Sequence, residues 1–508
     1  MPMKPPARLQ PFCSAVSAGY ARIFSRHRLV WLTLLWVGYA VFTFCGVWHH
    51  EPWRDELQAW LIARELDIPG IFYQMRYEGH FALWSLLLKI FTSLGAGLIW
   101  MGVLSWALML LAAWLLLFRS PFSGWVKALL LLSFPTLYYF PVVARCYALI
   151  PPLLFLLAIT YERLSAGRGH FRYCILLGLL AHTHAYMEGM VGILFLIYVY
   201  DYVVAPWPRR TAGERWRSLL PPLVTVLLVV AAFLQVLPAL TTDMGAKHRY
   251  YTLDNTLEYI SGTVQSREMP FMEGLTDVLF ILLLLAFIIR YRKGYNPRIP
   301  LLLLGAIGWQ IYFSTSIYGM NLQRPYLILY VLIFAFWILR GDDRIPQLAL
   351  GLIALFTMYR LPDAVADFTQ PYTNVKEIAA WMERRLPPGE RIAVDNMGKV
   401  ISAYAPEYRY FSVSTGKPIP LYAPHDLDKR EPLEKWCDTV TCKPLYYVRG
   451  GIKLGPFLAR FKKMKPRYRL EQVLPRPKQP AALAEVFYLF RLIPQPVAEE
   501  AQADSLKR

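Results

Sequence analysis

The feature that most constrains this chain is a series of long apolar runs over its first two-thirds. A run of about twenty apolar residues is long enough to cross a bilayer as a helix. We identify eleven predicted spans in the 508 residues, at 29–47, 97–118, 125–141, 145–161, 171–187, 190–204, 219–240, 275–289, 299–316, 322–339 and 347–358. Hydrophobic residues make up 56% of the chain, which a soluble globular protein of this length would rarely show. The sequence therefore predicts a polytopic α-helical membrane protein with about 11–12 membrane helices.

Basic residues mark one side of these predicted spans. Much of the formal net charge of +19 falls in short loops between the apolar runs, where the positive-inside rule places it, so the charge implies no nucleic-acid partner. The run at 29–47 lacks a small-residue cleavage site, so we expect it to stay as an anchor with segment 1–28 in the cytoplasm. The turns expected on the same side carry Arg163, Arg168, Arg172, Arg209, Arg210, Arg215, Arg217, Arg290, Arg292, Lys293, Arg298, Arg340 and Arg344.

One further apolar run, at 81–94, is short for a full crossing and closer to the length of an interfacial segment. We therefore expect it to form a short or tilted helix that does not reverse the topology. Residues 29–361 then form a membrane module whose outer loops are 48–80 and 241–273.

The chain changes character after this module. Residues 362–493 are predicted to form a small α/β domain, with a helix over 375–386 and a strand over 391–394, and 494–508 to form a disordered tail. An odd number of spans places this domain outside the cytoplasm. In that oxidising compartment Cys437 and Cys442 are expected to close a small disulfide loop, with two free thiols as the alternative.

The sharpest chemical signal follows the first span, where Glu51-Pro52 leads into an Arg-Asp-Glu sequence. Proline and acidic residues favour the first turn of a helix, so we predict a short helix over 53–66 whose apolar side is suited to lying on the bilayer. Neighbouring residues on a helix point about 100° apart, so Asp55 and Glu56 cannot both aim at one atom and should have different roles. The alternative is an ordinary polar loop helix.

Two arginines lie on the predicted outer side, against the positive-inside rule. They are Arg145 and Arg324, each at the end of a span. A bound phosphate would account for both, because a guanidinium matches phosphate bidentately. For Arg145 the alternative is snorkelling to the interface. Lys247 and Arg249 in the loop 241–273 either form a solvated face or hold an anionic head group.

Histidines lie near the same face. His80 precedes the short apolar run and is either a hydrogen-bonded anchor or a ligand-contacting residue. His182 and His184 approach the outer end of their span, but residues at i and i+2 do not share a helix face, so a paired metal site is not expected.

The order of these motifs resembles the GT-C superfamily of integral-membrane glycosyltransferases, with family 39 and family 83 types as the nearest relatives. The resemblance rests on the first span, the loop Arg54-Asp55-Glu56, the His-led segment at His80, and Ala144-Arg145-Cys146-Tyr147-Ala148-Leu149 after a tyrosine pair. It covers roughly residues 29–340 in layout, and the outer C-terminal domain also fits.

The resemblance implies an inverting transferase that moves a sugar from a polyprenyl-phosphate carrier to an acceptor hydroxyl of a glycan, lipid or protein. It implies a multi-pass protein of the bacterial inner membrane. Asp55 would be the general base, and Glu56 would orient the acceptor or Arg54. Arg145, Arg324, Lys247 and Arg249 would stabilise the leaving phosphate, and Arg54, His80, His184 and Tyr147 would line the substrate site. We assign no metal; Asp55, Glu56 and His80 could supply ligands to a divalent ion.

Two other functions compete with transfer. A transporter or flippase of a lipid-linked anion would also place charges in a helical bundle, but transport sites usually lie near the midplane rather than at one face. A polysaccharide polymerase or ligase would use outer arginines and has no obvious use for the early acidic pair.

Overall fold

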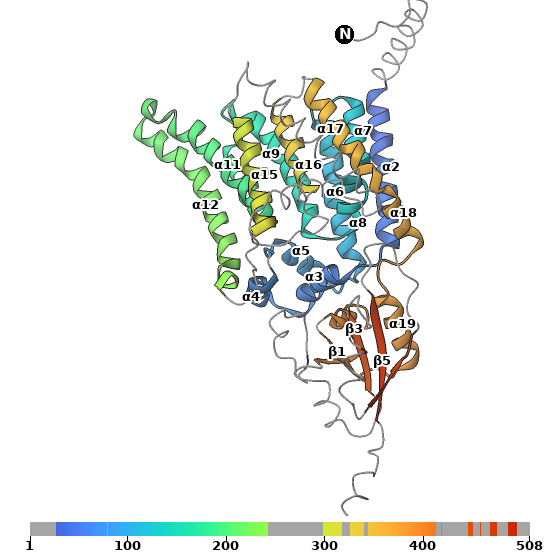
Figure 1. Cartoon of the computed structure of the whole chain (residues 1–508). Coiled ribbons are helices and arrows are strands. Elements are labelled where there is room, and N and C mark those ends of the chain that lie inside the picture. Colours follow the sequence, from blue (N-terminus) through green and yellow to red (C-terminus); the bar gives the residue numbers. More distant parts are fainter. Residues whose placement is uncertain are drawn as a thin grey trace, which may run out of the picture.

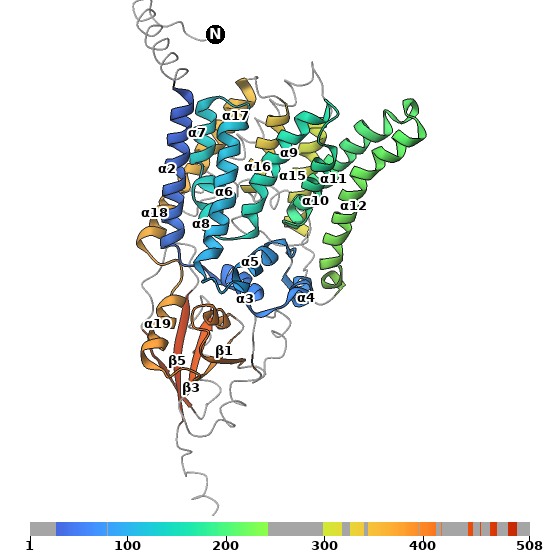
Figure 2. The same ribbon diagram turned by 180° about the vertical axis from the view of Figure 1, so that it is seen from behind.

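The computed structural model describes residues 27–78, 80–241, 298–316, 326–339, 344–395, 397–412, 418, 445–450, 458, 468–474 and 486–494. They form a helical bundle with a small β-sheet domain at one end, and three short helices lie between the two (Figure 1; Figure 2 shows the reverse side). The bundle contains α2 (Arg28–His49), α6 (Ile99–Arg119), α7 (Gly124–Leu132), α8 (Phe140–Val142), α9 (Ile150–Leu164), α10 (His170–Ala181), α11 (Glu188–Val199), α12 (Ala212–Thr241), α15 (Arg298–Ser316), α16 (Tyr326–Ile338) and α17 (Arg344–Thr357).

The bundle has the composition and length of a membrane domain. Among the described residues, six helices are long and apolar enough to cross a membrane, and a seventh crossing results if α7 and the segment Pro135–Val142, bent by 59°, are one span. Of the other predicted spans, 171–187 and 322–339 correspond to the shorter helices α10 and α16, and 299–316 corresponds to the 19-residue α15, which is not among the six. The predicted span 275–289 lies outside the described residues. The predicted fold class, a polytopic α-helical membrane protein, is confirmed.

Helices in the bundle differ in the face they bury. Every residue of α16 from Tyr326 to Trp337 is buried, as expected of a helix enclosed by others. By contrast, α12 exposes Leu220, Leu223, Leu227 and Leu234 on its surface. A row of large exposed apolar side chains is costly in water but suits contact with lipid.

The short helices α3 (Arg54–Glu65), α4 (Ile68–Glu78) and α5 (Leu83–Ser93) lie together at the end of the bundle that faces the sheet domain (Figure 1). The 11-residue α5 packs against α3 at this end, as expected for a helix that does not cross. The predicted helix over 53–66 is confirmed as α3, but its apolar side does not face the bilayer. Leu57, Trp60 and Leu61 are buried in a core shared with α5 and the sheet domain.

The C-terminal domain is an α/β unit reached through α18 (Leu361–Thr369). Its strands are β1 (Arg391–Val394), β2 (Arg409–Ser412), β3 (Leu445–Gly450), β4 (Tyr468–Gln472) and β5 (Phe487–Pro494), in the order β2-β1-β3-β5-β4. β1 pairs in parallel with β2 and β3, whereas β5 is antiparallel to both of its neighbours. The predicted helix and first strand are present as α19 (Val375–Arg385) and β1. Cys437 and Cys442 lie outside the described residues.

Candidate active site at the sheet-facing end of the bundle

The centre of the site is an ion pair between residues far apart in the chain. Asp55 is the second residue of α3, and Arg145 precedes the short helix η2 (Cys146–Leu149). Arg145 Nη1 lies 2.7 Å from Asp55 Oδ2, with the arginine side chain 8% and the aspartate side chain 25% exposed. Arg54 Nη2 lies 3.3 Å from the other oxygen of the same carboxylate. Solvent or a ligand can therefore reach the carboxylate, while the guanidinium of Arg145 is mostly enclosed.

A broken helix places Arg145 here. Pro135 begins the segment η1 (Pro135–Tyr139), and Pro141 follows in α8; because proline has no amide hydrogen, neither can continue a regular helical ladder. The chain then leaves the helix with Arg145 in an extended conformation (φ −127°, ψ 163°). Ser105 of α6 donates to the Phe140 carbonyl at 2.8 Å and fixes the end of the broken helix.

Glu56 has partners different from those expected from the sequence. Its side chain is fully buried, and it accepts hydrogen bonds from the backbone N–H of Ala144 at 2.6 Å and of Trp53 at 3.1 Å. It thus ties the start of α3 to the residue before Arg145. An acceptor group would have to displace these bonds to reach this carboxylate.

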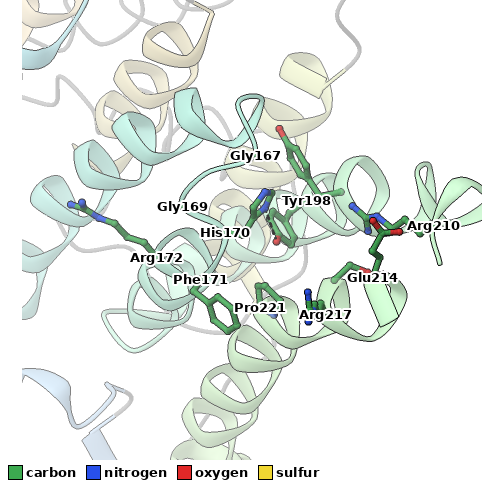
Figure 3. A pocket seen from close by; sticks show the side chains of 12 residues that line it. Gly167, Gly169, His170, Phe171, Arg172, Tyr198, Arg210, Glu214, Arg217 and Pro221 are labelled. Carbon is green, nitrogen blue, oxygen red and sulfur yellow. Dashed lines mark hydrogen bonds between the residues drawn. The ribbon is translucent and has the colours of Figure 1, made fainter. Parts of the chain in front are cut away.

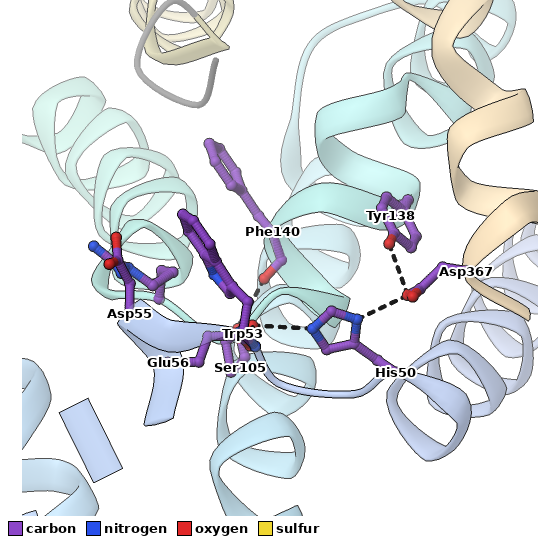
Figure 4. A network of polar contacts seen from close by, with 10 residues as sticks. His50, Trp53, Asp55, Glu56, Ser105, Tyr138, Phe140 and Asp367 are labelled. Carbon is purple, nitrogen blue, oxygen red and sulfur yellow. Dashed lines mark hydrogen bonds and ion pairs between the residues drawn. The ribbon is translucent and has the colours of Figure 1, made fainter. Parts of the chain in front are cut away.

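The same carboxylate belongs to a buried network that the sequence reasoning missed (Figure 4). His50 Nε2 lies 3.0 Å from Glu56 Oε2, and His50 Nδ1 lies 2.8 Å from Asp367 Oδ2 of α18. Tyr138 donates to the same Asp367 oxygen at 2.7 Å. Burial lowers the pKa of His50, but the flanking Glu56 and Asp367 carboxylates outweigh it and raise the pKa to about 10. His50 is therefore a cation at neutral pH.

Two further predicted residues lie next to the ion pair. Arg145 Nη2 lies 3.1 Å from His80 Nε2, and the rings of His80 and His184 are 5.0 Å apart. His184 stacks on Tyr147, whose hydroxyl oxygen lies 3.3 Å from its Nε2. Because His184 Nδ1 accepts the Tyr186 amide at 3.2 Å, the ring hydrogen belongs on Nε2, pointing to Tyr147.

The structure thus brings together six of the predicted site residues, namely Arg54, Asp55, Glu56, His80, Arg145 and His184, and places Tyr147 beside them. The other three, Lys247, Arg249 and Arg324, lie outside the described residues. Within the described residues no group of three or more His, Cys, Asp or Glu side chains has the arrangement of a metal site.

The missed residues carry a weak sequence signal. His50 stands six positions before Glu56 in a loop already singled out, but nothing in the sequence links either to Tyr138 or to Asp367. These contacts arise only from the packing of α18 against α2, which a single sequence does not reveal.

Comparison with known proteins agrees with this architecture. No protein-family model and no curated protein matches the chain. Among solved structures, the chain is similar to ArnT from Cupriavidus metallidurans bound to undecaprenyl phosphate, with a TM-score of 0.52 and 12% sequence identity over 90% of this chain and 98% of that one. The apo state of the same protein gives a TM-score of 0.51 and 12% identity over 93% and 98%.

The similarity extends over nearly the whole of both chains, so it includes the membrane module and the sheet domain together. The chain therefore has the fold of ArnT over nearly its whole length.

Proposed function

We propose that this protein is an inverting glycosyltransferase that moves a sugar from a polyprenyl-phosphate donor to an acceptor hydroxyl. The observation that carries the proposal is the ion pair of Asp55 and Arg145 at the sheet-facing end of an ArnT-like fold. A carboxylate that can take a proton and a guanidinium that can hold a phosphate are the two groups that such a transfer requires. The undecaprenyl phosphate bound by ArnT supports a donor of this class.

The chemistry can be assigned to specific atoms. The acceptor oxygen attacks the anomeric carbon while Asp55 takes the hydroxyl proton, general-base work that typically contributes 10²–10⁴-fold. The bond between the anomeric carbon and the phosphate oxygen breaks, and the electron pair stays on the lipid phosphate. Arg145 stabilises that growing charge. One displacement inverts the configuration at the anomeric carbon.

The ion pair gives Arg145 a second role. Without a donor, its guanidinium is 2.7 Å from the Asp55 carboxylate and 3.1 Å from the His80 ring. A donor phosphate would compete with Asp55 for the guanidinium, and losing that partner makes the carboxylate a stronger base. Donor binding would thereby activate the base only when there is something to transfer. His80, His184 and Tyr147 would then contact the sugar or the acceptor, with Glu56 holding the Ala144 backbone in place.

The test measures sugar transfer by the purified protein after it has been placed in membranes. Labelled polyprenyl-phosphate sugars and candidate acceptors are added to these membranes. Asp55→Asn keeps the size of the side chain but removes the base, so we expect transfer to fall at least about a hundredfold while donor binding persists. Arg145→Gln should weaken donor binding as well as transfer.

Asp67→Asn is the matched control. Asp67 is an exposed carboxylate whose Oδ1 accepts the Gly70 amide at 2.8 Å, a bond that asparagine can also accept. The Asp67→Asn variant should therefore transfer sugar at the wild-type rate. Transfer by Asp55→Asn at the same rate as Asp67→Asn would remove Asp55 from the mechanism. Movement of the lipid across the bilayer without any transfer would favour the flippase alternative.

A further inference from the structure

A second site lies at the opposite end of the bundle from the Asp55–Arg145 pair. It is a cavity of about 510 Å³ between the first turn of α10, the end of α11 and the first turns of α12 (Figure 3). The helix α12 connects the two ends: Gln235 accepts the Ala82 amide at 2.8 Å near the candidate active site, whereas Arg217 lines the cavity. At 1.5 Å per residue, these positions are about 27 Å apart.

The cavity is cationic. Arg172, in the first turn of α10, Arg210, just before α12, and Arg217, in the second turn of α12, line it (Figure 3). Within the part of the chain that the structure describes, no carboxylate forms an ion pair with Arg210 or Arg217. Arg210 Nη1 is buried there without a hydrogen-bond partner. Buried donors in native proteins are nearly always paired, so this unpaired nitrogen, on a residue that lines the cavity, points to Arg210 as a group that can bind an acceptor.

The neighbouring acids are engaged elsewhere. Glu214 accepts hydrogen bonds from the backbone N–H and the hydroxyl of Thr211, both at 2.9 Å, and so caps the start of α12. Asp201 pairs with Arg298. Counting the three arginines and the one carboxylate in the lining, the cavity carries a formal charge of +2. This net positive charge favours an anionic group such as a phosphate.

The surroundings are those of a lipid rather than a soluble anion. Phe171 and Pro221 line the cavity beside the arginines. Phe171 is 51% exposed, and two residues of α12 that do not line the cavity, Leu220 and Trp216, are 51% and 73% exposed. Large exposed apolar residues next to a tryptophan are typical of the level where acyl chains meet head groups. His170 and Tyr198, joined at 3.1 Å between Nδ1 and the hydroxyl, form a polar wall suited to the head-group oxygens.

We propose that this cavity binds the phosphodiester head group of an anionic membrane phospholipid. Arg210 and Arg217 hold the phosphate, and the acyl chains leave past Phe171 and Pro221 along the exposed face of α12. The site is separate from the donor site of the proposed transferase and does not depend on it.

The experiment compares purified wild-type protein with Arg210→Gln, Arg217→Gln and, as a matched control, Arg163→Gln. Arg163 is an exposed arginine at the end of α9, at the same end of the bundle, and does not line the cavity. Each protein is placed in nanodiscs of phosphatidylcholine, with or without phosphatidylglycerol. Thermal unfolding and the phospholipid retained in native mass spectrometry are measured.

We expect phosphatidylglycerol to raise the unfolding temperature of the wild type and of Arg163→Gln. The increase should be much smaller for Arg210→Gln and Arg217→Gln. Retained phosphatidylglycerol should fall roughly tenfold for each charge-assisted bond that is lost. Similar unfolding temperatures in phosphatidylcholine alone show that the variants are folded. If one of the two cavity variants does not fold, the other tests the proposal by itself.

Two results would overturn the proposal. An equal response of all four proteins would mean that phosphatidylglycerol acts through general surface charge. In a third condition, inorganic phosphate is added to wild-type protein in phosphatidylcholine nanodiscs. If it raises the unfolding temperature as much as phosphatidylglycerol does, the cavity binds a soluble anion and not a lipid.

Discussion

At the scale of single residues, the two neighbouring carboxylates of α3 have separate tasks. Asp55 faces Arg145 and remains partly exposed, whereas Glu56 is fully buried against Ala144 and His50. The 100° turn between adjacent helical residues, which can be read from the sequence, predicted this division. What each carboxylate contacts could not be predicted, because Ala144 and Arg145 come from a segment distant in the chain.

Glu56→Gln tests this division. The amide can still accept the Ala144 bond, but it leaves the buried His50 cation with Asp367 as its single carboxylate partner. Breaking a buried ion pair typically costs about 3–5 kcal/mol, so we expect a clearly lower free energy of unfolding, measured by denaturation in detergent. Asp55→Asn, at the more exposed position, should lower it by less, because the asparagine oxygen can still accept from Arg145 and the guanidinium keeps its contact with His80. Equal destabilisation by both substitutions would mean that Glu56 has no special structural role.

Asp395 in the sheet domain carries a pH prediction. Burial raises the pKa of Asp395 to about 6, although its Oδ1 accepts the backbone N–H groups of Met397, Gly398 and Gly450. Because the folded pKa lies above the usual 3.8, this residue contributes stability below about pH 4 that is lost as the pH rises towards 6. Asp395→Asn keeps an acceptor oxygen and cannot ionise. Its stability relative to wild type should therefore increase between pH 4 and pH 6 in unfolding measurements; an unchanged difference across that range would contradict the assignment.

At the scale of elements, apolar length and periodicity predicted which segments are helices but not how closely they pack. The structure places α11 against α15 so tightly that a Cβ at Gly189 would collide with the side chain of Trp309 and the backbone of Gly305. Small residues at such interfaces allow helices in a membrane to approach each other. Because the sequence does not show how elements pack, the prediction that the apolar side of α3 lies on the bilayer was wrong. Its apolar side was correctly identified, but the sequence could not show that the sheet domain, rather than lipid, covers it.

Gly189→Ala is therefore expected to destabilise the protein by about 1–3 kcal/mol, because α11 and α15 must separate to admit the methyl group. Gly192→Ala is the internal control, since it lies on the same helix and a Cβ there would have no atom within 4 Å. Thermal unfolding in detergent compares the two. Should both variants unfold at the same temperature, the contact between α11 and α15 would not limit stability.

At the scale of the whole molecule, the bundle has two chemically different ends. The sheet domain, α3 and the Asp55–Arg145 pair occupy one end, and the turns that carry Arg163, Arg210 and Arg217 occupy the other. This asymmetry follows from the charges that the sequence places between its apolar runs. If the basic end is cytoplasmic, as the positive-inside rule predicts, the sheet domain and the proposed transfer site lie on the outer face of the membrane.

Cysteine labelling in intact cells tests this orientation. In a background with the six native cysteines replaced by serine, Arg384→Cys places a thiol on the exposed side of α19, and Ser165→Cys places one in the exposed turn after α9. The reagent is a maleimide that passes the outer layers of the cell envelope but cannot cross the membrane in which the protein lies. It should label position 384 in intact cells and position 165 only after lysis. The reverse pattern would put the Asp55–Arg145 pair in the cytoplasm. A donor displayed on the outer face could then not reach it, and the proposed transfer would have to use a carrier facing inward.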